Sequence, residues 1–158
     1  MRSIVSKGGL PMKKLLAAVA AGMLLTGAVC FAAVPADEVA IAGLAPGSSV
    51  ENAKSKLGTP THTTGKKLYF ANGVMVEVAK YNPGMVEEIE ILSAGAATPG
   101  GVQVGMAESA ITEKYGQPDK LDRDYDDTEY TYYSHDYVRK MEFKVVGGKI
   151  VKIKCEMR

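Results

Sequence analysis

The sequence predicts an α+β fold of two tandem repeats, each a helix followed by about three antiparallel strands, with the helix packed on one sheet face. Two observations carry this prediction. A helical stretch that ends in Gly-x-Pro occurs at Gly58–Pro60 and again at Gly116–Pro118. After each one, apolar and polar residues alternate over short runs that turn residues separate. The 158-residue chain is long enough for one domain or two very small ones.

The first 36 residues are typical of a secretory signal peptide. A positive start at Met12-Lys13-Lys14 is followed by an uncharged run that ends in small residues, and cleavage is expected after Ala33 or Ala36. If Met12 is the true start, residues 1–11 are a mis-assigned extension. The chain is therefore expected to be exported, to the periplasm or out of the cell.

Two other fates of this leader stay open. The run is long enough to span a bilayer, so an uncleaved leader would be a membrane anchor. Lipid attachment at Cys30 is the other alternative, although Val29 stands where a lipoprotein signal has a small residue.

Charge and cysteine content narrow the possible partners. Four of the 19 Lys and Arg residues lie in the leader and all 18 Asp and Glu residues lie after it. The mature chain thus has 15 basic against 18 acidic side chains, a net charge of −3. With no basic stripe, nucleic acid is not an expected partner. Cys155 is the one cysteine after the leader and cannot form an internal disulfide.

Each repeat is expected to open with a helix. Their apolar faces follow the 3.6-residue period and consist of Val50, Ala53 and Leu57 in the first helix and Ala107, Ile111 and Tyr115 in the second. Ser48 or Ser49 is expected to cap the first helix, whereas the second has no Ser or Thr in place. Gly58 and Gly116 supply a left-handed residue after each end, and the Pro that follows prevents continuation.

Antiparallel strands are expected after each helix. Asn72-Gly73 between alternating apolar residues is a strong hairpin signal, and Gly147-Gly148 marks another tight turn. The residues expected to face the core are Leu68, Phe70, Val74, Val76, Val78, Ile89 and Ile91, then Met141, Phe143, Val145, Val151, Ile153 and Cys155. The first repeat spans residues 37–92, the linker 93–101 and the second repeat 102–158.

The motif that opens each repeat resembles known exported modules. The stretches "GSSVENAKSKLGTP" and "TPGGVQVGMAESAITEKYGQPD" resemble the opening of the beta-lactamase inhibitor protein family and of the small outer-membrane assembly lipoproteins of the SmpA/OmlA type. The resemblance implies a tandem helix-plus-sheet module with a concave sheet. It implies no particular partner, because the motif is a helix end and a turn.

Tyrosines concentrate in the second repeat, where six extra residues also lie. Six of the eight tyrosines fall between residues 115 and 137. Tyrosine is a frequent contact residue at interfaces, so a binding site is predicted at Tyr125, Tyr130, Tyr132 and Tyr137. The alternative is that these side chains simply belong to strands and cover the helix.

No catalytic or metal-binding pattern is present in the sequence. His62 and His135 have no metal-ligand spacing with another His or Cys, and the acids around Asp122–Asp127 match only the first half of a calcium loop. Cys155 alternates with Ile153 and is expected to be a buried, inert thiol. We therefore predict no enzyme activity, no cofactor and no metal.

These observations predict an exported, non-catalytic binding module. Its partner is expected to be a protein or another envelope component that contacts the sheet surface and the Tyr- and Asp-rich insertion of the second repeat. Membrane contact is expected only through an uncleaved leader. A structural cell-envelope protein without a specific ligand is the alternative, and an enzyme with dispersed catalytic residues is a third class.

Overall fold

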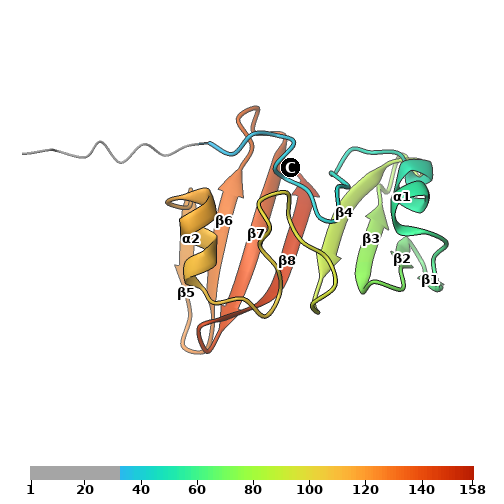
Figure 1. The fold of residues 1–158 in the computed structure, drawn as a ribbon. Coiled ribbons are helices and arrows are strands. Elements are labelled where there is room, and N and C mark those ends of the chain that lie inside the picture. The colour runs from blue at the N-terminus through green and yellow to red at the C-terminus, as the bar shows by residue number, and fades with distance from the viewer. Residues whose placement is uncertain (1–32) are drawn as a thin grey trace, which may run out of the picture.

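The computed structural model describes residues 33–158 of the chain (Figure 1). The leader prediction, with Cys30 and the start at Met12, therefore lies outside the described residues except for its last four positions. Neither helix in the described part has the length and apolarity that a bilayer crossing requires.

The described chain forms one antiparallel sheet of eight strands and two short helices, which occur in the order α1, β1–β4, α2, β5–β8. The helices are α1 (Val50–Leu57) and α2 (Ser109–Tyr115). The strands are β1 (His62–Thr64), β2 (Lys67–Tyr69), β3 (Val74–Val78), β4 (Val86–Ile91), β5 (Lys120–Arg123), β6 (Thr128–Tyr133), β7 (Arg139–Val146) and β8 (Lys149–Met157). Across the sheet they lie in the order β1-β2-β3-β4-β8-β7-β6-β5.

The predicted fold class is wrong. The strands do not form two separate repeats, because the inner edge of β4 pairs with β8 and joins all eight strands into one sheet. Ile89 lies opposite Cys155 and Ile91 opposite Ile153 at this junction. Alternation of apolar residues identifies hairpins between neighbours in sequence, but it does not reveal which outer edges pair over a long separation.

Both helices end as predicted, and their starts differ. Ser49 caps α1, since its side chain accepts a 3.1 Å hydrogen bond from the N–H of Asn52. Of the two serines expected as the cap, Ser49 is therefore the one that forms it. The N-cap of α2 is Glu108, which makes no side-chain capping bond. Gly58 and Gly116 have φ values of 88° and 72°, the left-handed region that favours glycine.

Two short strands show no apolar alternation in the sequence, and two residues predicted to face the core do not. Ala107, expected on the apolar face of the second helix, precedes α2 and is exposed. All residues of β1 and β5 are exposed, so neither strand shows apolar alternation. Near the turn between β7 and β8 the register shifts at Lys144/Val145, which puts Ile150 opposite Val145. Ile150 is consequently buried in the place expected for Val151, which is only half-buried.

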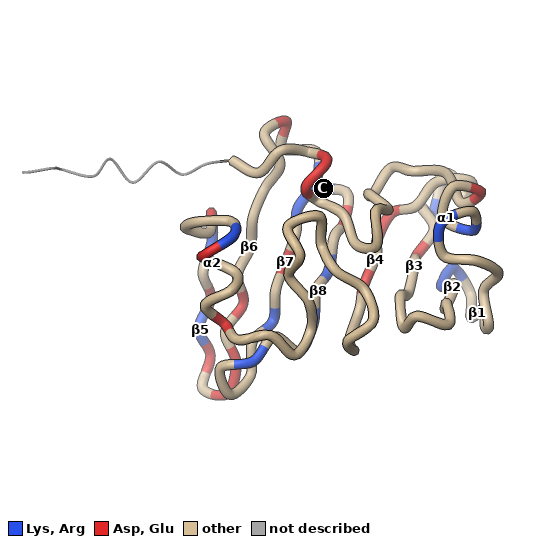
Figure 2. The backbone as a smooth tube through the Cα atoms, viewed as in Figure 1, with Lys and Arg blue, Asp and Glu red and all other residues tan. Residues whose placement is uncertain are grey.

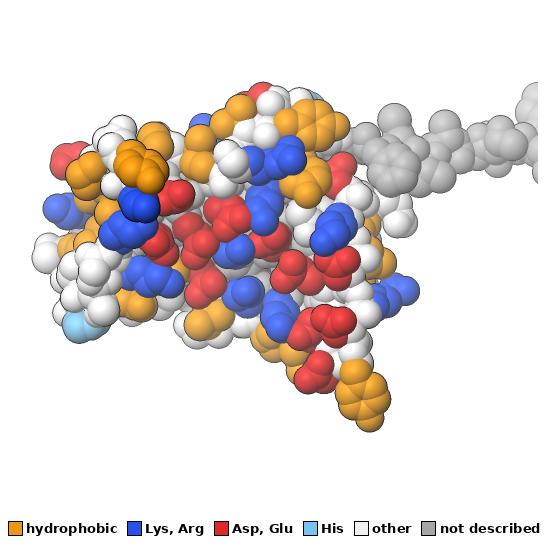
Figure 3. All heavy atoms as spheres, turned by 180° about the vertical axis from the view of Figure 1, so that it is seen from behind, with side chains coloured by type: hydrophobic (Ala, Val, Ile, Leu, Met, Phe, Trp, Pro, Cys, Tyr) orange, Lys and Arg blue, Asp and Glu red, His pale blue; other side chains and the backbone are white. Residues whose placement is uncertain are grey.

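The core lies between one sheet face and a cover made of the helices, the N-terminal segment and the loop before α2. Val39, Ile41 and Leu44 of the N-terminal segment are fully buried, and Figure 1 shows α2 and the loop before it lying over one face. No described helix packs on the opposite face, which carries interleaved acidic and basic side chains in Figure 3. Figure 2 shows where the acidic and basic residues lie along the strands. We call this the open face.

Candidate functional site

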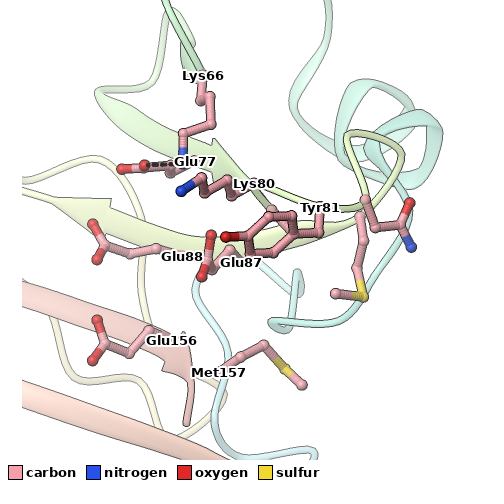
Figure 4. Close-up of a pocket in the computed structure, with 11 residues that line it drawn as sticks. Lys66, Glu77, Lys80, Tyr81, Glu87, Glu88, Glu156 and Met157 are labelled. Atoms are coloured by element: carbon pink, nitrogen blue, oxygen red, sulfur yellow. Dashed lines mark ion pairs between the residues drawn. The ribbon is translucent and has the colours of Figure 1, made fainter.

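A cavity of about 600 Å³ opens on the sheet near the junction of β3, β4 and β8. It is lined by Lys66, Glu77, Ala79, Lys80, Tyr81, Asn82, Met85, Glu87, Glu88, Glu156 and Met157. Figure 4 shows side chains from β3 and the loop after it on one side and from β8 on the other, with Glu88 of β4 between them. The cavity therefore spans the strands that join the two halves of the sheet.

Three glutamates lie in a row across this cavity. Glu88 of β4 is the register partner of Glu77 on β3 and of Glu156 on β8. Successive side chains of a strand point to opposite faces of the sheet. Because Ile89 is fully buried in the core, its neighbour Glu88 points to the open face. Like charges directly opposite each other on neighbouring strands are destabilising, so the row needs compensating cations.

The two outer glutamates of the row are neutralised by lysines. Glu77 pairs with Lys66 at 3.3 Å and Lys67 at 3.6 Å. Glu156 pairs with Lys140 at 2.7 Å and Lys154 at 3.0 Å. Within residues 33–158, no lysine or arginine forms an ion pair with the central glutamate, so the site has an acidic centre between two neutral flanks.

The protonation of Glu88 reflects this environment. Burial raises the pKa of Glu88, and its hydrogen bond with Glu156 raises it further, to about 7 despite the nearby charge of Lys154. Burial alone would also raise the pKa of Glu156, but hydrogen bonds from Lys140 and Lys154 hold it below its ordinary value. The proton of this pair is therefore carried by Glu88, whereas Glu156 is ionised at neutral pH.

A closed ion-pair network lies beside the row. On β7 and β8, Lys140 is opposite Glu156 and Glu142 is opposite Lys154. Glu142 accepts from both lysines at 2.6 Å, which lowers its pKa although burial alone would raise it. Because every member of this network has oppositely charged neighbours, it presents little net charge to a ligand.

The rim of the cavity offers an exposed aromatic ring. Tyr81 is 88% exposed, and the ammonium of Lys80 lies 5.0 Å from its ring centroid. Figure 4 shows both side chains beside Glu87 on the cavity wall. An exposed aromatic ring next to carboxylates is suited to hold a cationic group, through its π face and the negative charge together.

The described residues offer neither a preformed metal site nor a reactive thiol. Among the residues that the structure describes, no group of three or more His, Cys, Asp or Glu side chains is arranged to hold a metal ion. Cys155 lies in the core as predicted, and burial raises the pKa of its thiol well above the ordinary value, so the thiolate nucleophile is not populated.

Two of the four predicted tyrosines are core residues. Tyr130 and Tyr132 are 6% and 1% exposed. The Tyr130 hydroxyl donates to Glu108 at 2.5 Å, and the Tyr132 hydroxyl donates to the carbonyl of Gly116 at 2.9 Å. Tyr132 also packs against Phe143 with its ring centroid 6.1 Å away. These two rings pack beneath α2, as the alternative interpretation of the tyrosines expected. They present no free surface to a partner.

The other two predicted tyrosines are exposed on two turns of the second half of the sheet. Tyr125 lies in the turn between β5 and β6 and is fully exposed, and Tyr137 lies in the turn between β6 and β7 and is 60% exposed. Neither lines the cavity. Tyr137 instead lies near Tyr133 and the guanidinium of Arg158. The structure does not bring the four predicted residues together.

Sequence reasoning did not select Glu88, Glu87 or Tyr81. In the sequence Glu88 is a polar position that precedes the inward-facing Ile89, and nothing local distinguishes it from other glutamates on strands. The row of three glutamates depends on the pairing of β4 with both β3 and β8, a long-range property of the sheet.

Neither a family model nor a curated protein matches this chain. Among solved structures it is similar to a DUF4309 family protein, YjgB, from Bacillus subtilis, with a TM-score of 0.50 and 14% identity over 70% of this chain and 79% of that one. It is also similar to a cysteine-rich secretory protein from Staphylococcus aureus, with a TM-score of 0.51 and 11% identity. That match covers 80% of this chain and 48% of the other. At these identities the similarity concerns the fold alone.

Proposed function

We propose that this chain is an exported, non-catalytic binding module that holds a protein or other envelope component on the open face of its sheet. The observation that carries the proposal is the cavity over β3, β4 and β8, whose central carboxyl group, Glu88, has no cationic partner among the described residues. The ligand group that fits this cavity is a cation, such as a lysine or arginine side chain of the partner.

The charge of the cavity supports this ligand class. Its lining includes four glutamates and two lysines, and Lys66 is already paired with Glu77. A cation that enters replaces the proton of Glu88 and meets the ring of Tyr81 at the rim. Cation binding should then weaken as the pH falls below about 7, because protonation of Glu88 competes with the ligand.

Export rests on the sequence of the leader, and the description of one similar structure supports it. One of the similar structures is described as a secretory protein. The absence of an internal disulfide does not oppose export, since the apolar core on the helix side of the sheet extends through both halves.

The proposal is tested by photo-crosslinking in cells. A photoreactive phenylalanine analogue is placed at Tyr81 in the full-length protein, and at Glu51 as the control, because Glu51 is exposed on α1 on the covered side of the molecule. We expect a discrete adduct at position 81 and none at position 51, with identification of the partner by mass spectrometry. Equal labelling at both positions, or none at either, would contradict the proposal.

The ligand class is tested with purified protein. An oligolysine peptide should shift the backbone amide resonances of Glu87 and Glu88, whereas an oligoglutamate peptide of the same length should not. Glu88→Gln should weaken the oligolysine effect, and Glu113→Gln, which removes an exposed carboxylate on α2, should leave it unchanged. An oligolysine response that is the same in both variants would rule out the cavity as the cation site.

A further inference from the structure

We propose that processing cuts the bond between Ala32 and Ala33, so that the mature chain begins at Ala33 and its new α-ammonium is held by Glu38. This inference rests on the export part of the proposed function. In the reaction, an envelope peptidase uses water to hydrolyse the peptide bond. The carboxylate stays on Ala32 of the leader, and Ala33 gains the amino group, which is protonated at neutral pH.

Val34 is a structural residue of the folded protein. It is 3% exposed and forms a parallel bridge with Ser134 at the end of β6. Its N–H donates to the carbonyl of Tyr133 at 3.3 Å, and its carbonyl accepts from the N–H of His135 at 3.0 Å. Cleavage after Ala36, one of the two bonds expected from the sequence, would remove a buried apolar side chain and both hydrogen bonds.

The neighbours of Val34 are also used by the fold. The carbonyl of Ala33 contacts the ring Nε2 of His135, and the carbonyl of Ala36 accepts from the guanidinium of Arg139 at 3.1 Å. That bond is made by a terminal nitrogen of the guanidinium, whereas the Nε of Arg139 is buried and has no hydrogen-bond partner within residues 33–158. Loss of Ala36 would leave this half-buried cation with fewer hydrogen bonds, which is costly. The segment 33–36 therefore belongs to the mature protein.

A cavity of about 200 Å³ marks where the new terminus lies. It is lined by Ala33, Val34, Pro35, Glu38, Lys114 and Tyr115. Among the described residues, the Oε2 atom of Glu38 is buried and has no hydrogen-bond partner. A buried carboxylate oxygen without a donor is costly, and an ammonium at Ala33 would provide that donor in the same cavity. Lys114 contributes a second cation to the lining, so Glu38 is also the group that offsets repulsion between the two.

The residues directly before this bond match the preference of signal peptidases for small side chains. Cleavage after Ala32 puts small residues at both positions that such enzymes read, with Ala32 directly before the bond and Cys30 two residues earlier. Cleavage after Ala33, the other bond expected from the sequence, would put Phe31 at the second position. It would also remove the Ala33 carbonyl that contacts His135.

The test is N-terminal sequencing and intact-mass measurement of protein expressed with its own leader, after cell fractionation. We expect exported protein that begins at Ala33. A start at Asp37, or a lipid-modified Cys30, overturns the inference and leaves export intact. An exported chain with its leader uncut also overturns the inference alone. A full-length chain retained in the cytosol overturns both the inference and the export proposal.

A second measurement tests the partner of the new terminus. In the processed protein, Glu38→Gln should lower the midpoint of thermal unfolding by about 3 °C, because the ammonium loses its carboxylate. Asp37→Asn, an exposed carboxylate next in sequence, is the matched control and should leave the midpoint unchanged. An equal or higher midpoint for Glu38→Gln would overturn the assignment of Glu38.

Discussion

The two halves of the sheet bury the same face with different kinds of side chain. In the first half, α1 and β1–β4, the buried side chains are mainly small and aliphatic, such as Ala53, Val76 and Val86. In the second half, α2 and β5–β8, Tyr115, Tyr132 and Phe143 form a cluster whose ring centroids lie 5.6 to 6.1 Å apart. The second half also has the longer strands, with nine residues in β8 and eight in β7.

On the open face the two halves differ in how their charged side chains are paired. The second half closes its charges into pairs, with Lys140, Glu142, Lys154 and Glu156 in one network and Lys144 bound to Asp127 at 2.5 Å. The first half leaves Glu88 unneutralised beside a cavity. The conspicuous tyrosines of the second half thus stabilise the fold, and most residues that line the proposed binding cavity belong to the half with the plainer sequence.

The largest expected effect tests the difference between the two cores. Phe143→Ala should lower the free energy of unfolding by about 4–5 kcal/mol, because it removes a fully buried ring and its contacts with Tyr115 and Tyr132. Phe70→Ala, the matched change in the first half, should cost about 3 kcal/mol, since that ring has no aromatic contact among those described. Chemical denaturation measures both. If the two variants lost equal amounts of unfolding free energy, the contacts within the aromatic cluster would add no stability beyond the burial of one ring.

The next effect tests the closed network. Glu142→Gln should cost about 2 kcal/mol, because Glu142 is 6% exposed and its loss leaves Lys140 and Lys154 to share Glu156. Urea unfolding of the variant is compared with that of Glu113→Gln, which should differ from the wild type by less than about 0.5 kcal/mol. A Glu142→Gln protein as stable as this control would show that the network contributes nothing.

A smaller effect tests the helix starts. Ser49→Ala should lower stability by about 1 kcal/mol, because it removes the acceptor for the N–H of Asn52. Ser48→Ala is the control and should be nearly neutral, which also decides between the two serines that the sequence offered as caps. Thermal unfolding of the two variants makes the comparison, and a larger loss for Ser48→Ala would mean that the cap is misassigned.

The smallest effect is pH-dependent and tests the open face. The pKa of Glu88 is raised from 4.5 to about 7 in the folded protein, so between these values the folded state holds a proton that the unfolded state has released. Stability from this group therefore falls as the pH rises from about 4.5 to about 7, and stays level above it. Glu88→Gln should be more stable than the wild type at pH 8 by on the order of 0.5–1 kcal/mol, after allowance for solvent screening, and similar at pH 4.

Unfolding measured at pH 4, 6 and 8 tests this sign. A Glu88→Gln protein that is less stable than the wild type at pH 8 would show that the ionised carboxylate is stabilised by a partner in the fold. A constant difference at all three pH values would show that Glu88 does not titrate in this range.

What the sequence could predict was local. Gly58, Gly116, Asn72-Gly73 and Gly147-Gly148 were correctly assigned to helix ends and turns, because their backbone requirements depend on a few adjacent residues. The inward positions along β3, β4 and β7 followed from alternation for the same reason.

What the sequence could not predict was the pairing of distant edges. The contact of β4 with β8 decided both the single sheet and the row of Glu77, Glu88 and Glu156. The tyrosines were misleading for a related reason, since Tyr130 and Tyr132 have the composition of an interface but find their hydroxyl partners in Glu108 and Gly116 of their own chain.

The position of the last strand has a consequence for how the molecule is made. β8 ends at Met157 and lies in the middle of the sheet, between β4 and β7. During synthesis the first four strands emerge well before their central neighbour exists, and β4 then exposes an unpaired edge with Ile89 and Ile91 beside it. This edge is closed only when β8 pairs with β4. Folding of the whole sheet therefore has to wait until β8 has emerged, and a chain that lacks β8 cannot complete it.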